Sequence, residues 1–208
     1  MHKKDAGVTL SDMIQIVKCC VEDHSWRMRT AIATNYGKFA TCFSSSDVCA
    51  EIFPLLGTLL VDTEIDIRVS ACATGVDFLD IVGVADYLKE ISPICQQLSD
   101  DDAPNARKAV ADLVVDSAVK VGQDHAASHL NPLIMKFIGD VDPLVRIRII
   151  SKLSAITEKF PQVFNRLTST LQDLFSDPKW RVDKQMILAI SAVVKHLGQD
   201  DLLGQFLP

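Results

Sequence analysis

The chain has 208 residues, of which 48% are apolar, and a formal net charge of -6 at neutral pH. A chain of this length and composition can bury a sizeable core. Its acidic balance argues against nucleic acid as the main partner, because proteins bind nucleic acid chiefly through clustered Lys and Arg. The most apolar run, Ile52 to Val61, contains a proline and a glycine and is too short to span a membrane.

The cysteine pattern bears on the cellular compartment. Six cysteines are present, but no two form a Cys-x-x-Cys pair, so neither a disulfide framework nor a zinc site is indicated. The N-terminal residues also lack the continuous apolar stretch of a signal peptide. We therefore expect a reducing compartment, the cytoplasm and also the nucleus.

The first predicted element is a pair of helices. Apolar residues recur at helical spacing before Asp23, and a second stripe of the same kind follows it. The first stripe is Leu10, Met13, Ile14, Val17 and Val21, and the second is Met28, Ile32, Tyr36 and Phe39. The spacing predicts two amphipathic helices that meet at a turn around Asp23.

This arrangement repeats along the chain with a period of about 39 residues. An aspartate recurs at each predicted turn, and in four of the five units a basic residue stands six positions after it. The aspartates are Asp23, Asp62, Asp102, Asp140 and Asp177, and the bases are Arg29, Arg68, Lys108 and Arg146. Prolines at Pro54, Pro93 and Pro132 precede three of the aspartates by eight or nine residues.

The repeated residues suggest local roles. An aspartate between two helices is typical of an N-cap of the second helix, where its carboxylate accepts from free N–H groups. Pro143 and Pro178 follow an aspartate directly, as expected at the first position of a helix. Each proline inside a first helix is predicted to kink that helix.

Helix pairs that repeat at this period indicate an all-α fold, an α-solenoid of about five HEAT repeats. We expect antiparallel pairs in a single solenoid domain that forms a right-handed curved array. The predicted repeats are 10–41, 46–81, 84–121, 126–159 and 163–197. Residues 199–208 are expected to start a further repeat, so we interpret the chain as a piece of a longer solenoid.

No arrangement of residues predicts catalysis, a cofactor or a metal. His125 and His129 are four residues apart, but no third ligand is near them in sequence. The run Ser99 to Pro104 is acidic but lacks the glycine and the spaced ligands of a calcium loop. No phosphate-binding glycine loop is present. We therefore expect a protein that is not an enzyme and that binds other proteins.

Three segments resemble a known family. They are "DHSWRMR" at Asp23, "VRIRIISKL" at Val145 and "DPKWRVDKQMI" with the following "KHLG". These look like HEAT repeats of the scaffold (A, 65-kDa regulatory) subunit of protein phosphatase 2A, about the seventh to the eleventh of fifteen. The resemblance implies a non-catalytic platform whose intra-repeat turns receive both the catalytic subunit of a serine/threonine phosphatase and a B-type regulatory subunit.

The resemblance also assigns residues. It implies that Asp23, Trp26 and Arg27 lie on the regulatory-subunit side and that Lys179, Trp180 and Arg181 lie on the catalytic-subunit side. It implies further that the repeated aspartates and bases form a structural ladder between neighbouring repeats. Asp183 departs from the pattern, because the ladder requires a base at its position.

Other interpretations stay open at this stage. Trp26 and Trp180 could fill the junction between two units, or form binding hot spots, which are enriched in Trp and Arg. A HEAT adaptor or transport receptor for another cargo is the main alternative to a phosphatase scaffold. A HEAT-like DNA glycosylase fits less well, because it requires a basic face. Open solenoid ends could also let the chain self-associate.

Overall fold

The computed structural model describes residues 9–152, 155–156 and 159. Within these ranges the chain is helical and contains no strand, as the sequence predicts. None of the helices in this part of the chain is long and apolar enough to cross a bilayer. The chain divides into two compact units, Met1–Ile91 and Ser92–Pro208, which are described separately.

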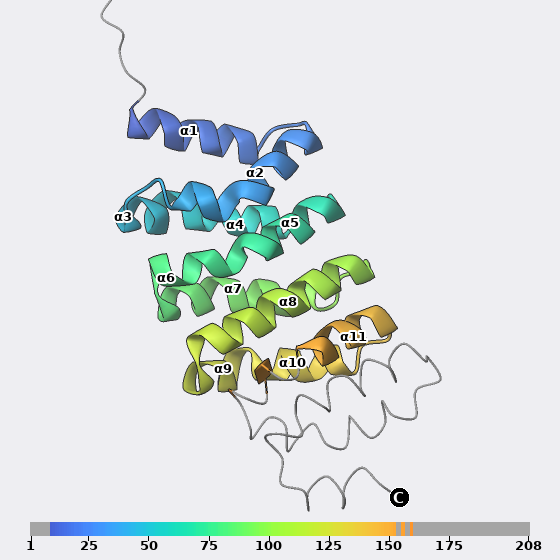
Figure 1. Ribbon diagram of the computed structural model, residues 1–208. Helices are drawn as coiled ribbons and strands as arrows, with labels where there is room; N and C mark the ends of the chain where they lie inside the picture. The colour runs from blue at the N-terminus through green and yellow to red at the C-terminus, as the bar shows by residue number, and fades with distance from the viewer. Residues whose placement is uncertain (1–8, 153–154, 157–158, 160–208) are drawn as a thin grey trace, which may run out of the picture. The chain divides into compact units, whose positions relative to one another are not determined.

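The first unit begins with two helices, α1 (Leu10–Val21) and α2 (Trp26–Ala40) (Figure 1). Thr9 and Asp12 form a capping box that satisfies free N–H groups at the start of α1. α1 buries Val17 and Val21, and α2 buries Ile32 and Tyr36. These residues belong to the apolar stripes that the sequence predicts, and they let the two helices pack together.

The second helix pair of this unit is less regular. Its first half consists of α3 (Ser45–Asp47), a π-helical turn (Val48–Ile52) and α4 (Phe53–Leu60). Its second half consists of α5 (Ile65–Gly75), a 3-10 turn (Val76–Phe78) and α6 (Leu79–Val82). The π turn ends just before Pro54, whose ring and missing N–H interrupt the normal hydrogen-bond pattern. The helix type therefore changes two residues before the proline at which the sequence predicts a kink.

Aromatic side chains join the two pairs of the first unit. The ring of Tyr36 on α2 lies 5.5 Å from that of Phe78, and Phe53 lies 5.6 Å from Phe78. The hydroxyl of Tyr36 donates to the carbonyl oxygen of Ile52 at 2.8 Å. Burial raises the pKa of this hydroxyl, so it remains a donor. Tyr36 thus fixes the distance between the first pair and the second.

Helix α7 (Val84–Leu98) passes from the first unit into the second. It continues through Pro93 as one α-helix, so the interruption seen near Pro54 and Pro132 does not recur at this predicted kink. The second unit contains α8 (Pro104–Val121), α9 (Gln123–His129), α10 (Asn131–Ile138) and α11 (Pro143–Ser151). The break between α9 and α10 falls just before Pro132, as predicted. α8 packs against both α10 and α11. Gly122 ends α8 at a φ of +83°, a conformation that favours glycine.

The predicted N-caps need a correction. The residue at the N-cap of α2 is Ser25 and that of α5 is Glu64, two positions after the repeated aspartates. The carboxylates of Asp23 and Asp62 instead accept the N–H groups of these cap residues, at 2.7 and 2.9 Å. The aspartates therefore close the turn ahead of the helix, because aspartate readily bonds to the backbone two residues on.

Pro143 occupies the predicted first turn of α11, next to its capping residue Asp142. Pro178, the fifth predicted repeat at 163–197 and the further repeat at 199–208 lie outside the described residues. The single solenoid domain and its repeat boundaries remain predictions.

Gly37 supplies a test of the packing between the two pairs of the first unit. A Cβ added at Gly37 would lie 2.1 Å from the Oδ2 atom and 2.8 Å from the Cβ atom of Asp77. We predict that Gly37→Ala lowers the free energy of unfolding by about 1–3 kcal/mol, because the two pairs must move apart. Urea unfolding measures the change.

The matched control adds Asp77→Ala to the same variant and removes the carboxylate that collides. It should recover part of the lost stability. A Gly37→Ala variant as stable as the unaltered chain would show that the two pairs are not this close.

Candidate functional site

Within each unit, an arginine joins one helix pair to the next. In the first unit, the guanidinium of Arg29 on α2 donates to both carboxylate oxygens of Asp62, with N–O distances of 2.7 and 3.0 Å. Both side chains are mostly buried. Two parallel, charge-assisted bonds of this kind fix orientation as well as distance. The second pair is therefore held in register against the first.

The same interaction recurs in the second unit. Arg107 on α8 donates to both carboxylate oxygens of Asp140, at 2.8 and 2.9 Å. Asp140 also accepts the N–H of Asp142, the N-cap of α11, at 2.8 Å. One carboxylate thus shapes its own turn and binds the preceding pair.

The third pair corrects the predicted register by one residue. The ladder positions are Asp101 and Arg107, where the sequence analysis placed Asp102 and Lys108. The carboxylate of Asp101 accepts the N–H of Ala103, and Arg107 donates to the carbonyl oxygen of Asp101, as their equivalents do elsewhere. Asp102 is exposed, and Lys108 bonds weakly to Asn105 at 3.5 Å. The sequence alone does not show which aspartate belongs to the ladder, because three aspartates are adjacent in this acidic run.

With this correction, the ladder residues recur at a constant interval. The four acids and the four bases are each spaced by 39 residues. They are Asp23, Asp62, Asp101 and Asp140, and Arg29, Arg68, Arg107 and Arg146. Each of these arginines also donates to the carbonyl oxygen of the aspartate six residues before it. The guanidinium of Arg29 or Arg107 therefore braces its own turn while it binds the next pair.

The electrostatics of the ladder follow from this geometry. Burial raises the pKa of Asp62, but the bonds from Arg29 and from the N–H of Glu64 outweigh burial and leave it below its usual value. The pKa of Asp140 is also lowered, because the bonds from Arg107 and from the N–H of Asp142 outweigh the effect of burial. The pKa of Arg29 is raised by its bond to Asp62. Both ladder pairs are consequently ionised at neutral pH.

The braced turn of the first pair presents the predicted Trp-Arg element. Trp26 is the first residue of α2, and 42% of it remains exposed although it is large and apolar. The guanidinium carbon of Arg27 lies 4.5 Å from the centroid of the indole, a cation–π contact. The preceding turn is held by the carboxylate of Asp23 and the guanidinium of Arg29. Trp26 and Arg27 therefore form an exposed, preordered edge.

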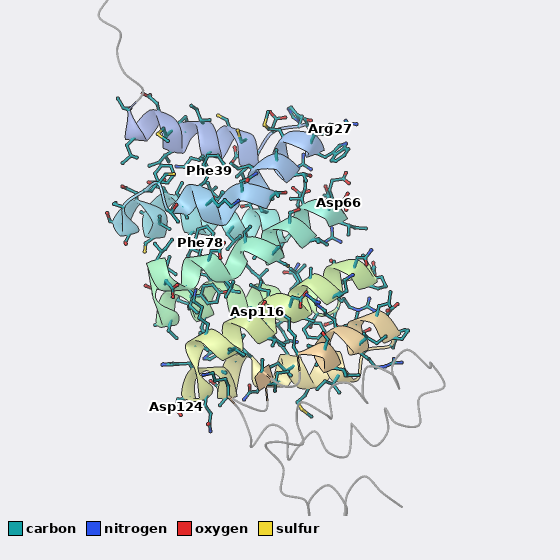
Figure 2. The ribbon with its side chains drawn as sticks, viewed as in Figure 1. Arg27, Phe39, Asp66, Phe78, Asp116 and Asp124 are labelled. Carbon is teal, nitrogen blue, oxygen red and sulfur yellow. The ribbon has the colours of Figure 1, made fainter. Side chains whose placement is uncertain are left out.

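The next turn carries the equivalent residues of the second pair. Ile65 stands 39 residues after Trp26 and is also 42% exposed, and Asp66 follows Arg27 by the same interval. Figure 2 shows Arg27 and Asp66 on the same side of the first unit. We call Trp26, Arg27, Ile65 and Asp66 the turn edge. The 39-residue interval identifies Ile65 and Asp66 from Trp26 and Arg27.

Two further polar features lie in the second unit. Arg148 donates to Asp112 at 2.6 and 2.7 Å, and Lys152 pairs with Asp116 at 2.7 Å, which links α11 to α8. A hollow of about 350 Å³ lies beside the turns. There the ammonium of Lys136 bonds to Asp100 at 2.6 Å and to Ser99 at 2.8 Å. Lys136 and Arg107 oppose the four aspartates Asp100, Asp101, Asp102 and Asp140, so the lining is acidic.

Several predicted site residues are not part of the described structure. Lys179, Trp180 and Arg181, assigned to the catalytic-subunit side, lie beyond it, as do Asp177 and Asp183. Among the residues that the structure does describe, no three His, Cys, Asp or Glu side chains are grouped so that they could hold a metal ion.

No protein-family model matches the sequence. Two curated proteins are similar to parts of it. The beta isoform of the human 65-kDa regulatory (A) subunit of serine/threonine-protein phosphatase 2A is 25% identical over 112 residues, 52% of this chain and 19% of that protein. Coatomer subunit gamma of Dictyostelium discoideum is 26% identical over 96 residues, 46% of this chain and 11% of that protein. The matched regions thus span a fifth or less of either relative.

Solved structures show the fold more directly. The crystal structure of Cex1p superimposes with a TM-score of 0.70 at 13% identity, over 89% of this chain and 36% of that one. A designed armadillo repeat protein, in complex with the peptide (KR)4, gives a TM-score of 0.55 at 15% identity, over 88% and 82% of the two chains. The fold is a HEAT/armadillo-like α-solenoid. The predicted fold class is confirmed.

The ladder predicts how stability depends on pH. The pKa of Asp62 in the folded protein lies below its usual value of 3.8. Its ionised form therefore contributes stability that is fully present above that value and is lost as the pH falls through the folded pKa. We predict a fall in the free energy of unfolding below about pH 4, and a shallower fall in Asp62→Asn. Urea unfolding at stepped pH values measures both.

Arg29→Gln serves as the second arm of this experiment, because it removes the partner and leaves the carboxylate in place. This variant should also show a weaker pH dependence of the free energy of unfolding. Equal slopes in all three proteins would contradict a stabilising role for the ionised pair.

Proposed function

We propose that this repeat protein is a non-catalytic scaffold that binds both the catalytic subunit of a serine/threonine phosphatase and a regulatory subunit through the turns of its helix pairs. The observation that carries the proposal is the turn edge of the first unit. Trp26 is 42% exposed at the start of α2 and lies under the guanidinium of Arg27. The solvent-exposed part of the indole does not contribute to packing in the protein's own core, so it is available to a partner.

The energetics favour binding at this edge. Trp and Arg are enriched among residues whose truncation costs about 2–4 kcal/mol of binding energy. The turn is held by Asp23 and Arg29, so a partner need not order it on binding. Ile65 adds an apolar contact one repeat further on. The turn edge therefore offers side chains that can anchor a partner, and little conformational entropy is lost when the partner binds.

The phosphatase assignment rests on similarity. The human 65-kDa regulatory protein matches 52% of this chain at 25% identity, and the segment around Trp26 resembles that family. On this basis Asp23, Trp26 and Arg27 bind a B-type regulatory subunit. On sequence alone, Lys179, Trp180 and Arg181 bind the catalytic subunit. The proposed location is the cytoplasm and the nucleus.

The proposal predicts a charge-specific loss of binding. The unaltered chain should bind a B-type regulatory subunit of protein phosphatase 2A, and Arg27→Glu should weaken that affinity by about tenfold or more, since it removes a hot-spot cation. Lys38→Glu is the matched control, because Lys38 is exposed near the other end of α2 and the change in charge is the same. Surface-immobilised binding measures the three affinities.

Circular dichroism should show the same helical content in all three proteins. Failure of the unaltered chain to bind any B-type subunit would overturn the phosphatase assignment. Equal weakening by both substitutions would show that net charge, and not the turn edge, governs binding.

A second candidate is favoured by the other curated match. The similarity to coatomer subunit gamma fits an adaptor that assembles with other cargo-handling proteins. Such an adaptor would use the same solenoid without a phosphatase. Retrieval of coat subunits with the full chain, in the absence of phosphatase subunits, would favour this function.

A further inference from the structure

Two apolar side chains are exposed at the turn between α10 and α11 in the second unit. Val141 is 88% exposed, and Leu144, the second residue of α11, is 45% exposed. The turn that carries them is ordered, because Asp140 accepts the N–H of Asp142 and Asp142 accepts that of Leu144, each at 2.8 Å. We call Val141 and Leu144 the apolar tip.

Stacking of a neighbouring helix pair does not cover the positions of the apolar tip. The residues that occupy the position of Val141 in the other described turns are all exposed, and they are His24, Thr63 and Asp102. Those that occupy the position of Leu144 are also exposed, and they are Arg27, Asp66 and Asn105. In each unit the first turn has a stacked pair after it and the second has one before it. The exposure of the tip is therefore a property of its place in the turn.

The hollow of the second unit lies directly beside the apolar tip. Its lining consists of residues 99–102, Arg107, Lys136 and residues 139–141, so Val141 forms part of its wall. The volume of about 350 Å³ is within the range of ligand pockets, roughly 300–1,000 Å³. Figure 1 shows that α8 and α11 begin on the same side of the second unit, which brings the turn before each of them to the hollow. We call this cavity the acidic hollow.

The charges of the acidic hollow indicate which group can occupy it. Arg107 is held by both carboxylate oxygens of Asp140. Lys136 is held by Asp100, whose side chain remains 73% exposed. Asp102 is exposed, and its carboxylate forms no hydrogen bond or ion pair with any residue that the structure describes. A basic side chain therefore complements the hollow, because it can form a charge-assisted bond to this carboxylate, whereas an anionic group is repelled.

We propose that the apolar tip and the acidic hollow bind a segment of a partner protein in which basic and apolar side chains alternate. A lysine or arginine of the segment enters the hollow and pairs with Asp102, and an apolar side chain packs on Val141 and Leu144. The cations of the hollow are held by their own partners, so the wall is ordered before the segment binds. This surface lies in the second unit and is separate from the turn edge. The proposal therefore stands or falls independently of the phosphatase assignment.

A synthetic peptide can test the charge recognition. The probe is a short, fluorescein-labelled peptide that alternates Arg and Leu, and fluorescence anisotropy measures its affinity for the full chain. Asp102→Asn should weaken that affinity by about tenfold, because it removes a charge-assisted bond. Asp124→Asn is the matched control, since Asp124 is exposed on α9 of the same unit and the change in charge is the same (Figure 2). The control should leave the affinity nearly unchanged.

The apolar contact has its own pair of variants. Val141→Ser should weaken the affinity by about threefold or more, because less apolar surface is buried against the leucines of the peptide. Val61→Ser should have little effect, since Val61 is 44% exposed but lies in the first unit. A peptide with Ser in place of Leu should bind the unaltered chain more weakly by a similar factor.

Three results would overturn the proposal. Equal weakening by Asp102→Asn and Asp124→Asn would show that net charge alone attracts the peptide. An unaltered affinity in Val141→Ser would show that the apolar tip takes no part. Absence of measurable binding, or equally tight binding of a peptide with Glu in place of Arg, would show that the hollow does not recognise a basic segment.

Discussion

The bidentate bond between an arginine of one helix pair and an aspartate of the next is the interaction on which the fold of each unit depends. Apolar burial supplies most of the stability of stacked helix pairs, but it specifies register weakly. Arg29 reaches Asp62 at 2.7 and 3.0 Å and also binds the carbonyl oxygen of Asp23. The position of one pair is thereby tied to the shape of the turn in the pair before it.

An ordered, solvent-exposed surface follows from this constraint. Because the arginine and the aspartate brace the turns, Trp26 and Arg27 are held at the start of α2 and face solvent without a large loss of order on binding. The turn edge is therefore an ordered surface that a partner can bind without rearranging it.

The repeat interval allowed much of the fold to be predicted, since it placed both helices of the first pair and the acid and base of the ladder. It failed at Asp102 and Lys108, because adjacent aspartates and adjacent bases are chemically alike and only the bonds of Asp101 and Arg107 distinguish them. The N-cap prediction failed because an aspartate carboxylate can accept backbone N–H groups either from the N-cap position or from two residues before it.

A double-mutant cycle on Arg29 and Asp62 tests the central claim most directly. Arg29→Met, Asp62→Leu and the double variant are unfolded in urea, and the coupling free energy is obtained from the four stabilities. A register-setting pair that is mostly buried should show a coupling of about 1–3 kcal/mol. The half-exposed pair of Lys18 and Glu51, treated in the same way, should show less than about 1 kcal/mol. A coupling between Arg29 and Asp62 no larger than that of Lys18 and Glu51 would contradict the account.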